Sequence, residues 1–155
     1  MTPHATAMAG VSLRPLRVIA TEGGPVLHML RADAPEFRTF GEVYFSLVEA
    51  GGVKAWKCHT RQTQHFAVPS GRMRLALFDG REGSPTRGSV LEVVLGRPDA
   101  YALLTIPPGI WYGFGALDGR EALLCNCADM PHDPQESLRL PRETEDIPYT
   151  WQPLP

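Results

Sequence analysis

Turn-forming residues recur at short intervals along the whole chain and leave room only for short elements of regular structure. The 155 residues include 15 glycines and 15 prolines. Between the turns, segments of alternating or continuous apolar character are typical of β-strands. These segments are 16–21, 26–31, 42–50, 53–59, 63–69, 72–79, 89–95, 100–106 and 121–128. No window of a dozen residues has a helical period, and residues 132–140 are the one short helix candidate.

This succession of short strands predicts an all-β sandwich or jelly-roll barrel. A chain of 155 residues is close to the usual size of one domain and is long enough to bury a core without disulfides. We therefore expect a single domain over residues 1–155, with its core at about 16–128. The Pro-rich tail, residues 129–155, is expected to wrap the outside or one mouth of the barrel.

Charge and hydropathy narrow the classes of partner. The formal net charge is −2 and no run of Lys or Arg occurs, which argues against nucleic acid. No segment approaches the ~18 apolar residues of a membrane span, and the first residues lack a signal-peptide core. A cytoplasmic protein without a membrane partner is expected. Cys58, Cys125 and Cys127 are interpreted as reduced and packed, with a Cys125–Cys127 metal site as the alternative.

The segment "GGVKAWKCHTRQTQHFAVPSG", residues 51–71, has the spacing of a metal-binding β-barrel motif. The slots that hold His, His and Glu in such a motif hold Lys57, His59 and Gln64 here. Strand parity places Lys57 and His59 on one face, near the open end of a barrel if that face points inward. The alternative is an amphipathic strand whose polar end lies in solvent.

A second segment, "LLTIPPGIWYGFGALDG" at 103–119, contains a rigid Pro-Pro-Gly turn followed by Tyr112. The two segments together resemble the cupin fold, in which a residue after this turn supplies the last metal ligand. Of the four cupin slots only His59 is a good ligand, since Lys57, Gln64 and Tyr112 bind cations poorly. We predict no catalytic metal and no cofactor.

More narrowly, "GEVYF", "VKAWKCH", "DGREGSPTRG", "LLTIPPGIWYGF" and "CNCAD" resemble the dTDP-4-dehydrorhamnose 3,5-epimerase family over roughly residues 36–151. The resemblance implies a metal-free enzyme that deprotonates the carbon beside a 4-keto group. Such an enzyme uses a His base backed by an Asp and a Tyr acid on the opposite face.

The family's catalytic positions are altered in this chain. The base His aligns with Lys57, and a Lys one strand later aligns with Gln64. The acid Tyr falls near Met130 or Pro131, and the backing Asp falls at Pro141 or Arg142. Proton transfer in this chain therefore requires other groups. The candidates are Lys57 or His59 as base and electrostatic group, with Tyr112 as acid.

The resemblance also implies substrate-binding residues. Arg38, Phe40 and Glu42 match the family's early strand, in which an Arg meets phosphate and a Phe and a Glu hold the nucleotide. Arg81 matches a family Arg, and a guanidinium suits phosphate. Gln64 and Asn126 complete the set of substrate-binding candidates. The alternatives are a surface or structural role for the two arginines and a core role for Phe40 and Tyr44.

Three further side chains have weaker claims to a functional role. His65 is one residue past the Gln64 slot, so strand parity points its side chain away from the cavity. His132 reaches the site only if the tail folds over the mouth of the barrel. Trp111 suits packing as well as sugar stacking.

The predicted function is metal-free epimerisation or isomerisation of a nucleotide-linked 4-keto sugar or a related small carbonyl compound. The alternative functions are an inactive sugar-nucleotide or carbohydrate binding cupin, and a structural protein with a filled barrel. The early strand over residues 40–50 is a natural edge for pairing with a second chain. We therefore expect a homodimer that places Arg38 and Glu42 near the neighbouring pocket.

Overall fold

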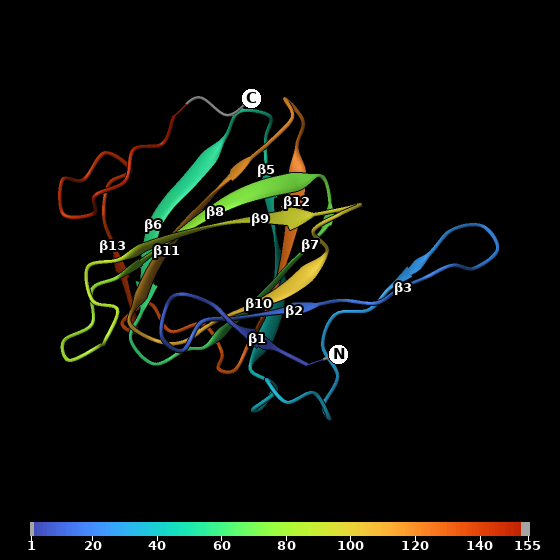
Figure 1. Ribbon diagram of the computed structural model, residues 1–155, viewed down its shortest axis with the longest axis horizontal. Helices are drawn as coiled ribbons and strands as arrows, with labels where there is room; N and C mark the ends of the chain where they lie inside the picture. Colours follow the sequence, from blue (N-terminus) through green and yellow to red (C-terminus); the bar gives the residue numbers. More distant parts are fainter. Residues whose placement is uncertain (1, 153–155) are drawn as a thin grey trace.

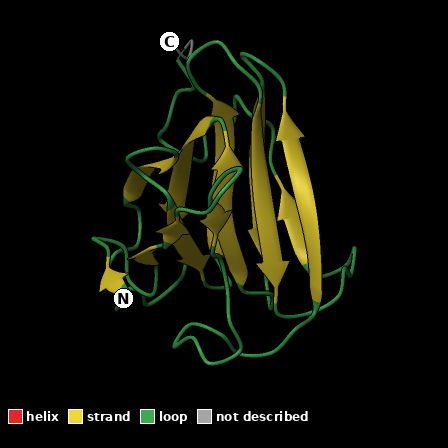
Figure 2. Ribbon diagram, turned by 90° about the vertical axis from the view of Figure 1, so that its right-hand side faces the viewer, coloured by secondary structure: helices red, strands yellow, loops and turns green. Residues whose placement is uncertain are grey.

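The computed structural model describes residues 2–152, and this part of the chain contains strands and no helix (Figure 2). The all-β prediction is confirmed. The strands are β1 His4–Ala5, β2 Ser12–Pro15, β3 Val18–Ile19, β4 Val26–Leu27, β5 Glu42–Val48, β6 Val53–His59, β7 Gln64–Ser70, β8 Arg72–Asp79, β9 Val90–Gly96, β10 Ala102–Ile106, β11 Ile110–Ala116, β12 Ala122–Ala128 and β13 Ser137–Arg139.

Two antiparallel sheets form a jelly-roll-like sandwich (Figure 1). The first sheet has the order β1-β2-β10-β7-β12-β5, and the second has the order β13-β6-β11-β8-β9. Alternation along each strand turns one set of apolar side chains inward between the sheets. On β8, for example, Met73, Leu75 and Leu77 are fully buried. Each such side chain contributes roughly 1.5–3 kcal/mol relative to an exposed one.

The helix candidate at 132–140 is wrong. Residues 137–139 instead form β13, which adds to the edge of the second sheet by pairing Ser137 with His59 and Arg139 with Lys57. This pairing uses the hydrogen-bonding edge of β6, so the sheet overrides a weak local helical preference. β13 thereby brings residues of the tail beside β6, the strand that carries Lys57 and His59.

The central strand β11 was missing from the sequence prediction. Its two glycines, Gly113 and Gly115, follow a Pro-Pro-Gly turn and therefore resemble an extended loop. At Gly113 the absent side chain is required by packing, since a Cβ would lie 2.6 Å from the Ala55 Cβ and 2.8 Å from the Trp151 ring. β11 lies between β6 and β8 and delivers Tyr112 to the interior.

The described part of the tail packs on the outer face of the second sheet. Ile147 and Trp151 form a buried cluster with Trp56 and Ala76. The Trp56 and Trp151 ring centroids lie 5.6 Å apart. The tail residues 153–155 lie outside the described residues, and the bounds 16–128 and 129–155 stay predictions. No helix in the described part of the chain is long and apolar enough to cross a membrane.

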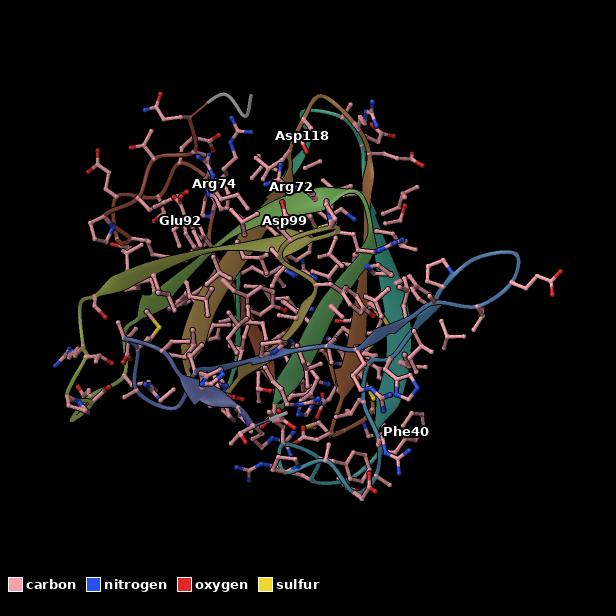
Figure 3. All side chains as sticks on the ribbon, turned by 45° about the vertical axis from the view of Figure 1, so that its right-hand side comes forward. Phe40, Arg72, Arg74, Glu92, Asp99 and Asp118 are labelled. Atoms are coloured by element: carbon pink, nitrogen blue, oxygen red, sulfur yellow. The ribbon has the colours of Figure 1, made fainter. Side chains whose placement is uncertain are left out.

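Large apolar side chains remain exposed on the β3–β4 hairpin, on β5 and the segment before it, and at Leu138 on β13. The β3–β4 hairpin, which reaches away from the two sheets in Figure 1, exposes 44% of Val18 and 48% of Val26. The segment that leads into β5 exposes 64% of Phe40, which lies at the end of the molecule opposite Asp118 in Figure 3. Phe45 is 63% exposed on the outer face of β5, an edge strand of the first sheet.

Candidate active site

A cavity of about 360 Å³ lies between the two sheets. One wall comes from β5, β7 and β12 and the other from β6, β11 and β13. Its lining combines apolar side chains with several polar and charged ones that can orient a small molecule. The lining residues are Tyr44, Ser46, Val53, Lys54, Ala55, Trp56, Lys57, Phe66, Tyr112, Phe114, Leu124 and Arg139.

Lys57 and Tyr112 both line the cavity, and they lie on neighbouring strands because β6 and β11 pair in a register that sets them opposite each other. Lys57 is partly buried, and within residues 2–152 its ammonium makes no hydrogen bond or ion pair. Burial lowers the pKa of Lys57 below its usual value, and the charge of Arg139 lowers it further. The cavity therefore holds a cation or amine with its donors free for a ligand.

His59 is buried behind Tyr112 and does not line the cavity. Its side chain is 5% exposed, and its Nε2 lies 3.0 Å from the Tyr112 hydroxyl. Burial lowers the pKa of His59, so the neutral imidazole is favoured. The sequence prediction that Lys57 and His59 both face the pocket is thus corrected: Lys57 faces it, and His59 reaches it through Tyr112.

Glu136 is the partner of His59 that sequence reasoning missed. Its carboxylate contacts the His59 Nδ1 through a short hydrogen bond and accepts the backbone N–H groups of Arg61 and Gln62, both at 3.0 Å. Burial alone would raise the pKa of Glu136, but these hydrogen bonds hold it below its usual value. Interpreting residues 132–140 as a helix hid this side chain, since only strand pairing with β6 brings Glu136 beside His59.

Gln64 and Asn126 do not contact the cavity, and their prediction as direct substrate ligands is corrected. They are 1% and 0% exposed and hydrogen-bond to each other. The His65 backbone N–H donates to the Asn126 Oδ1, so the Asn126 amide must present its N–H₂ to Gln64 and to the Tyr44 hydroxyl, 3.0 Å away. The Tyr44 oxygen accepts this hydrogen bond and keeps its own proton to donate toward the cavity.

Arg81 is a structural residue, so its prediction as a phosphate ligand is corrected. Its guanidinium donates to both carboxylate oxygens of Asp79, at 2.9 and 2.8 Å, and to the Ala9 carbonyl at 2.6 Å. The hydrogen bonds from Arg81, Ser84 and Thr86 lower the pKa of the buried Asp79. This network fixes the loop between β8 and β9, and none of its members lines the cavity.

Arg38 and Phe40 lie on the surface outside the cavity of their own chain, and Glu42 is partly exposed at the start of β5. His65 is buried away from the cavity, with its ring nitrogens 2.8 and 3.1 Å from the carbonyl oxygens of Cys127 and Glu36. Parity therefore placed His65 correctly.

The remaining sequence candidates lie outside the site. His132 is exposed, and Trp111 packs against the cluster under the tail. The three cysteines are free thiols. Among residues 2–152 no group of three or more His, Cys, Asp or Glu side chains is placed to hold a metal ion. The metal-free mechanism stays a prediction.

Known proteins similar to this chain include sugar epimerases and isomerases. No protein-family model matches the chain. A probable low-salt glycan biosynthesis epimerase, Agl13 of Haloferax volcanii, is 34% identical over 141 residues, which cover 90% of this chain and 86% of the relative. The crystal structure of a dTDP sugar isomerase from Desulfovibrio desulfuricans G20 is 54% identical with a TM-score of 0.92, covering 93% of this chain and 92% of that one.

More distantly related proteins have the same fold. RmlC from Legionella pneumophila, a dTDP-6-deoxy-D-glucose-3,5-epimerase solved in complex with dTDP-4-keto-L-rhamnose, has a TM-score of 0.85 at 20% identity. The alignment covers 99% of this chain and 84% of that one. The cupin-type jelly roll is therefore shared with this epimerase.

Proposed function

The chain belongs to the family of dTDP-sugar epimerases and isomerases, and from this premise we propose that it epimerises or isomerises a nucleotide-linked 4-keto sugar without a metal. Agl13 and the dTDP sugar isomerase support the reaction class. The substrate class is supported by the dTDP-4-keto sugar bound in the RmlC structure. A cytoplasmic location stays a prediction.

One observation carries the proposal: three proton-bearing side chains converge on one cavity from both sheets. Lys57, Tyr44 and Tyr112 come from β6, β5 and β11 and line the same space. Epimerisation beside a ketone needs a group that removes the carbon proton and donors that stabilise the enolate oxygen. Lys57 and Tyr44 can supply the donors, and Tyr112, which contacts His59, can carry the proton.

Two more cations in the cavity lining fit the diphosphate of the substrate. Lys54 and Arg139 are exposed at the rim, and within the described residues their side chains form no ion pair. A nucleoside diphosphate brings two anionic phosphates, for which Lys and Arg are the usual ligands. We place the sugar in the cavity and its diphosphate at this rim.

Solvent deuterium uptake tests the proposed function. The protein is incubated in D₂O with dTDP-4-keto-6-deoxyglucose, and proton NMR follows loss of the signals at the carbons beside the keto group. We expect exchange at one or both carbons, at a rate that scales with protein concentration. Binding of the sugar nucleotide is measured in parallel by calorimetry and by the shift in melting temperature. Binding without exchange contradicts turnover and supports the alternative, a sugar-nucleotide binding cupin.

We also propose that two chains form a homodimer through the exposed apolar surface of the hairpin and β5. Among residues 2–152, six of the seven large exposed apolar side chains lie on these elements or just before β5, and long apolar edge strands are rarely left uncovered. The dimer would carry Arg38 and Glu42 toward the partner's cavity, as the sequence predicts. The six residues are Val18, Val26, Phe40, Val43, Phe45 and Leu47.

Phe45→Asp is expected to dissociate the dimer. A two-fold interface contains Phe45 twice, and losing roughly 1.5–3 kcal/mol per buried copy raises the dissociation constant about 10²-fold or more. Sedimentation velocity over a range of concentrations measures the change. Leu138→Asp is the matched control, because Leu138 is 50% exposed but lies on β13, an edge strand of the second sheet that is not part of the proposed interface. A wild-type protein that sediments as a monomer contradicts the proposal.

A further inference from the structure

Glu136, His59 and Tyr112 form one buried row of hydrogen bonds that ends at the cavity. We infer that this row is a proton relay: His59 is the base of the reaction, acts on the substrate through the Tyr112 hydroxyl, and is held in the required tautomer by Glu136. The inference rests on the proposed function and adds to it the direction of proton movement and a positioning residue. Glu136 is 2% exposed and His59 is 4% exposed.

Two backbone N–H groups determine which atom is the donor and which the acceptor in each hydrogen bond of the row. The backbone N–H groups of Arg61 and Gln62 can only donate, and both point at the Glu136 Oε2. The other carboxylate oxygen faces the His59 Nδ1, which must therefore carry the imidazole proton. The His59 Nε2 then has a free lone pair, so the Tyr112 hydroxyl, 3.0 Å away, donates to it.

Tyr112 is the one member of the row that lines the cavity. Its ring is held by an edge contact with Phe66 at 5.2 Å between ring centroids and by stacking on Phe114 at 6.4 Å. A substrate proton can therefore reach His59 by way of the Tyr112 oxygen. Because its own proton already points at the His59 Nε2, the Tyr112 hydroxyl presents a lone pair to the cavity and is ready to accept.

The step balances without a cofactor or co-reactant. The C–H bond beside the ketone breaks, and its electron pair forms the enolate carbon–carbon double bond, leaving negative charge on the former keto oxygen. The proton binds the Tyr112 oxygen as the phenolic proton moves to the His59 Nε2. The resulting imidazolium faces the Glu136 carboxylate, and Lys57 and Tyr44 can donate to the enolate oxygen. Burial raises the pKa of Tyr112, which disfavours a tyrosinate. Because Tyr112 gains the substrate proton as it gives its own proton to His59, no buried tyrosinate forms.

The variant Glu136→Gln distinguishes a role of Glu136 in fixing the His59 tautomer from a role in packing alone. The glutamine has nearly the same shape, but the N–H groups of Arg61 and Gln62 require its carbonyl oxygen. Its N–H₂ group must then face the His59 Nδ1, which becomes an acceptor and leaves the imidazole proton on Nε2. In that tautomer His59 donates to Tyr112 and can no longer accept the substrate proton.

The test uses the full-length wild type, Glu136→Gln and the control Glu92→Gln, which removes a carboxylate that accepts a hydrogen bond from Tyr149 at 2.8 Å outside the cavity. Nitrogen-15 NMR of the histidine side chains reads the His59 tautomer. We expect Nδ1–H in the wild type and in Glu92→Gln, and Nε2–H in Glu136→Gln. Deuterium uptake should fall by about 10²–10⁴-fold in Glu136→Gln, with sugar-nucleotide affinity unchanged.

Tyr112→Phe is the second variant and covers the case in which Glu136→Gln fails to fold. It keeps the ring packing and should lose deuterium exchange while His59 stays in the Nδ1–H form. The relay is contradicted if His59 in the wild type carries its proton on Nε2. It is also contradicted if Glu136→Gln or Tyr112→Phe exchanges deuterium at the wild-type rate. A folded wild type that binds the sugar nucleotide without any exchange contradicts the proposed function itself, whereas its tautomer still decides the direction of the row.

Discussion

Lys57→Met is expected to slow deuterium exchange into the 4-keto sugar by on the order of 10²–10³-fold, the usual effect of removing one donor to an oxyanion. Lys57 lines the cavity beside Tyr112 and, within the described residues, has no protein partner for its ammonium. Methionine has a similar length and is apolar, so it fills the same space without charge. The stability of the fold should not fall, because no ion pair is broken and a partly buried cation is removed.

The control variant is Arg87→Met, which removes an exposed cation from the β8–β9 loop, outside the cavity lining. It should leave the exchange rate unchanged. Sugar-nucleotide binding to Lys57→Met, measured by calorimetry, should change little compared with the exchange rate, because the diphosphate contacts are assigned to Lys54 and Arg139. An exchange rate equal to that of the wild type would show that Lys57 does not act on the reacting carbonyl.

Strand patterning was sufficient to predict the fold class, since alternation over segments such as 72–79 depends on burial of one face. The strands β1 and β2 also precede the first predicted segment, and two further errors have clear physical causes. β11 contains Gly113 and Gly115, which lack the side chains on which alternation is judged. β13 is a strand through its pairing with β6, a long-range contact that local preference does not contain.

The same distinction explains how much of the site was predictable. Lys57 and Tyr112 line the cavity as predicted, because parity and the turn motif fix which face a strand residue takes. Glu136 could not be predicted without knowing that the tail pairs with the edge of β6. Gln64 and Asn126 were predicted as substrate ligands, because sequence could not show that they bond to each other and support Tyr44.

The largest effect on stability is expected from Gly41→Ala. Gly41 immediately precedes β5, and its N–H donates to the Ala128 carbonyl at 2.9 Å. A Cβ at this position would lie 2.1 Å from the Met130 backbone nitrogen and 2.3 Å from the Met130 Cα. Because the clash is with backbone, no side-chain rotation relieves it, and the start of the β5–β12 ladder must separate. That ladder carries Tyr44 opposite Asn126, so the cavity wall is disturbed as well.

We expect Gly41→Ala to lower the free energy of unfolding by about 3 kcal/mol or more, at the upper end of what overpacking costs. Urea denaturation followed by fluorescence measures the change, provided that the m value stays constant. Gly80→Ala is the matched control, because the nearest atom to its added Cβ, in Phe78, lies at an ordinary contact distance of 3.5 Å. That control should change stability by less than about 1 kcal/mol. Equal stabilities for the two variants would mean that Met130 does not pack against Gly41 and that the close approach of these two segments is not what anchors β5.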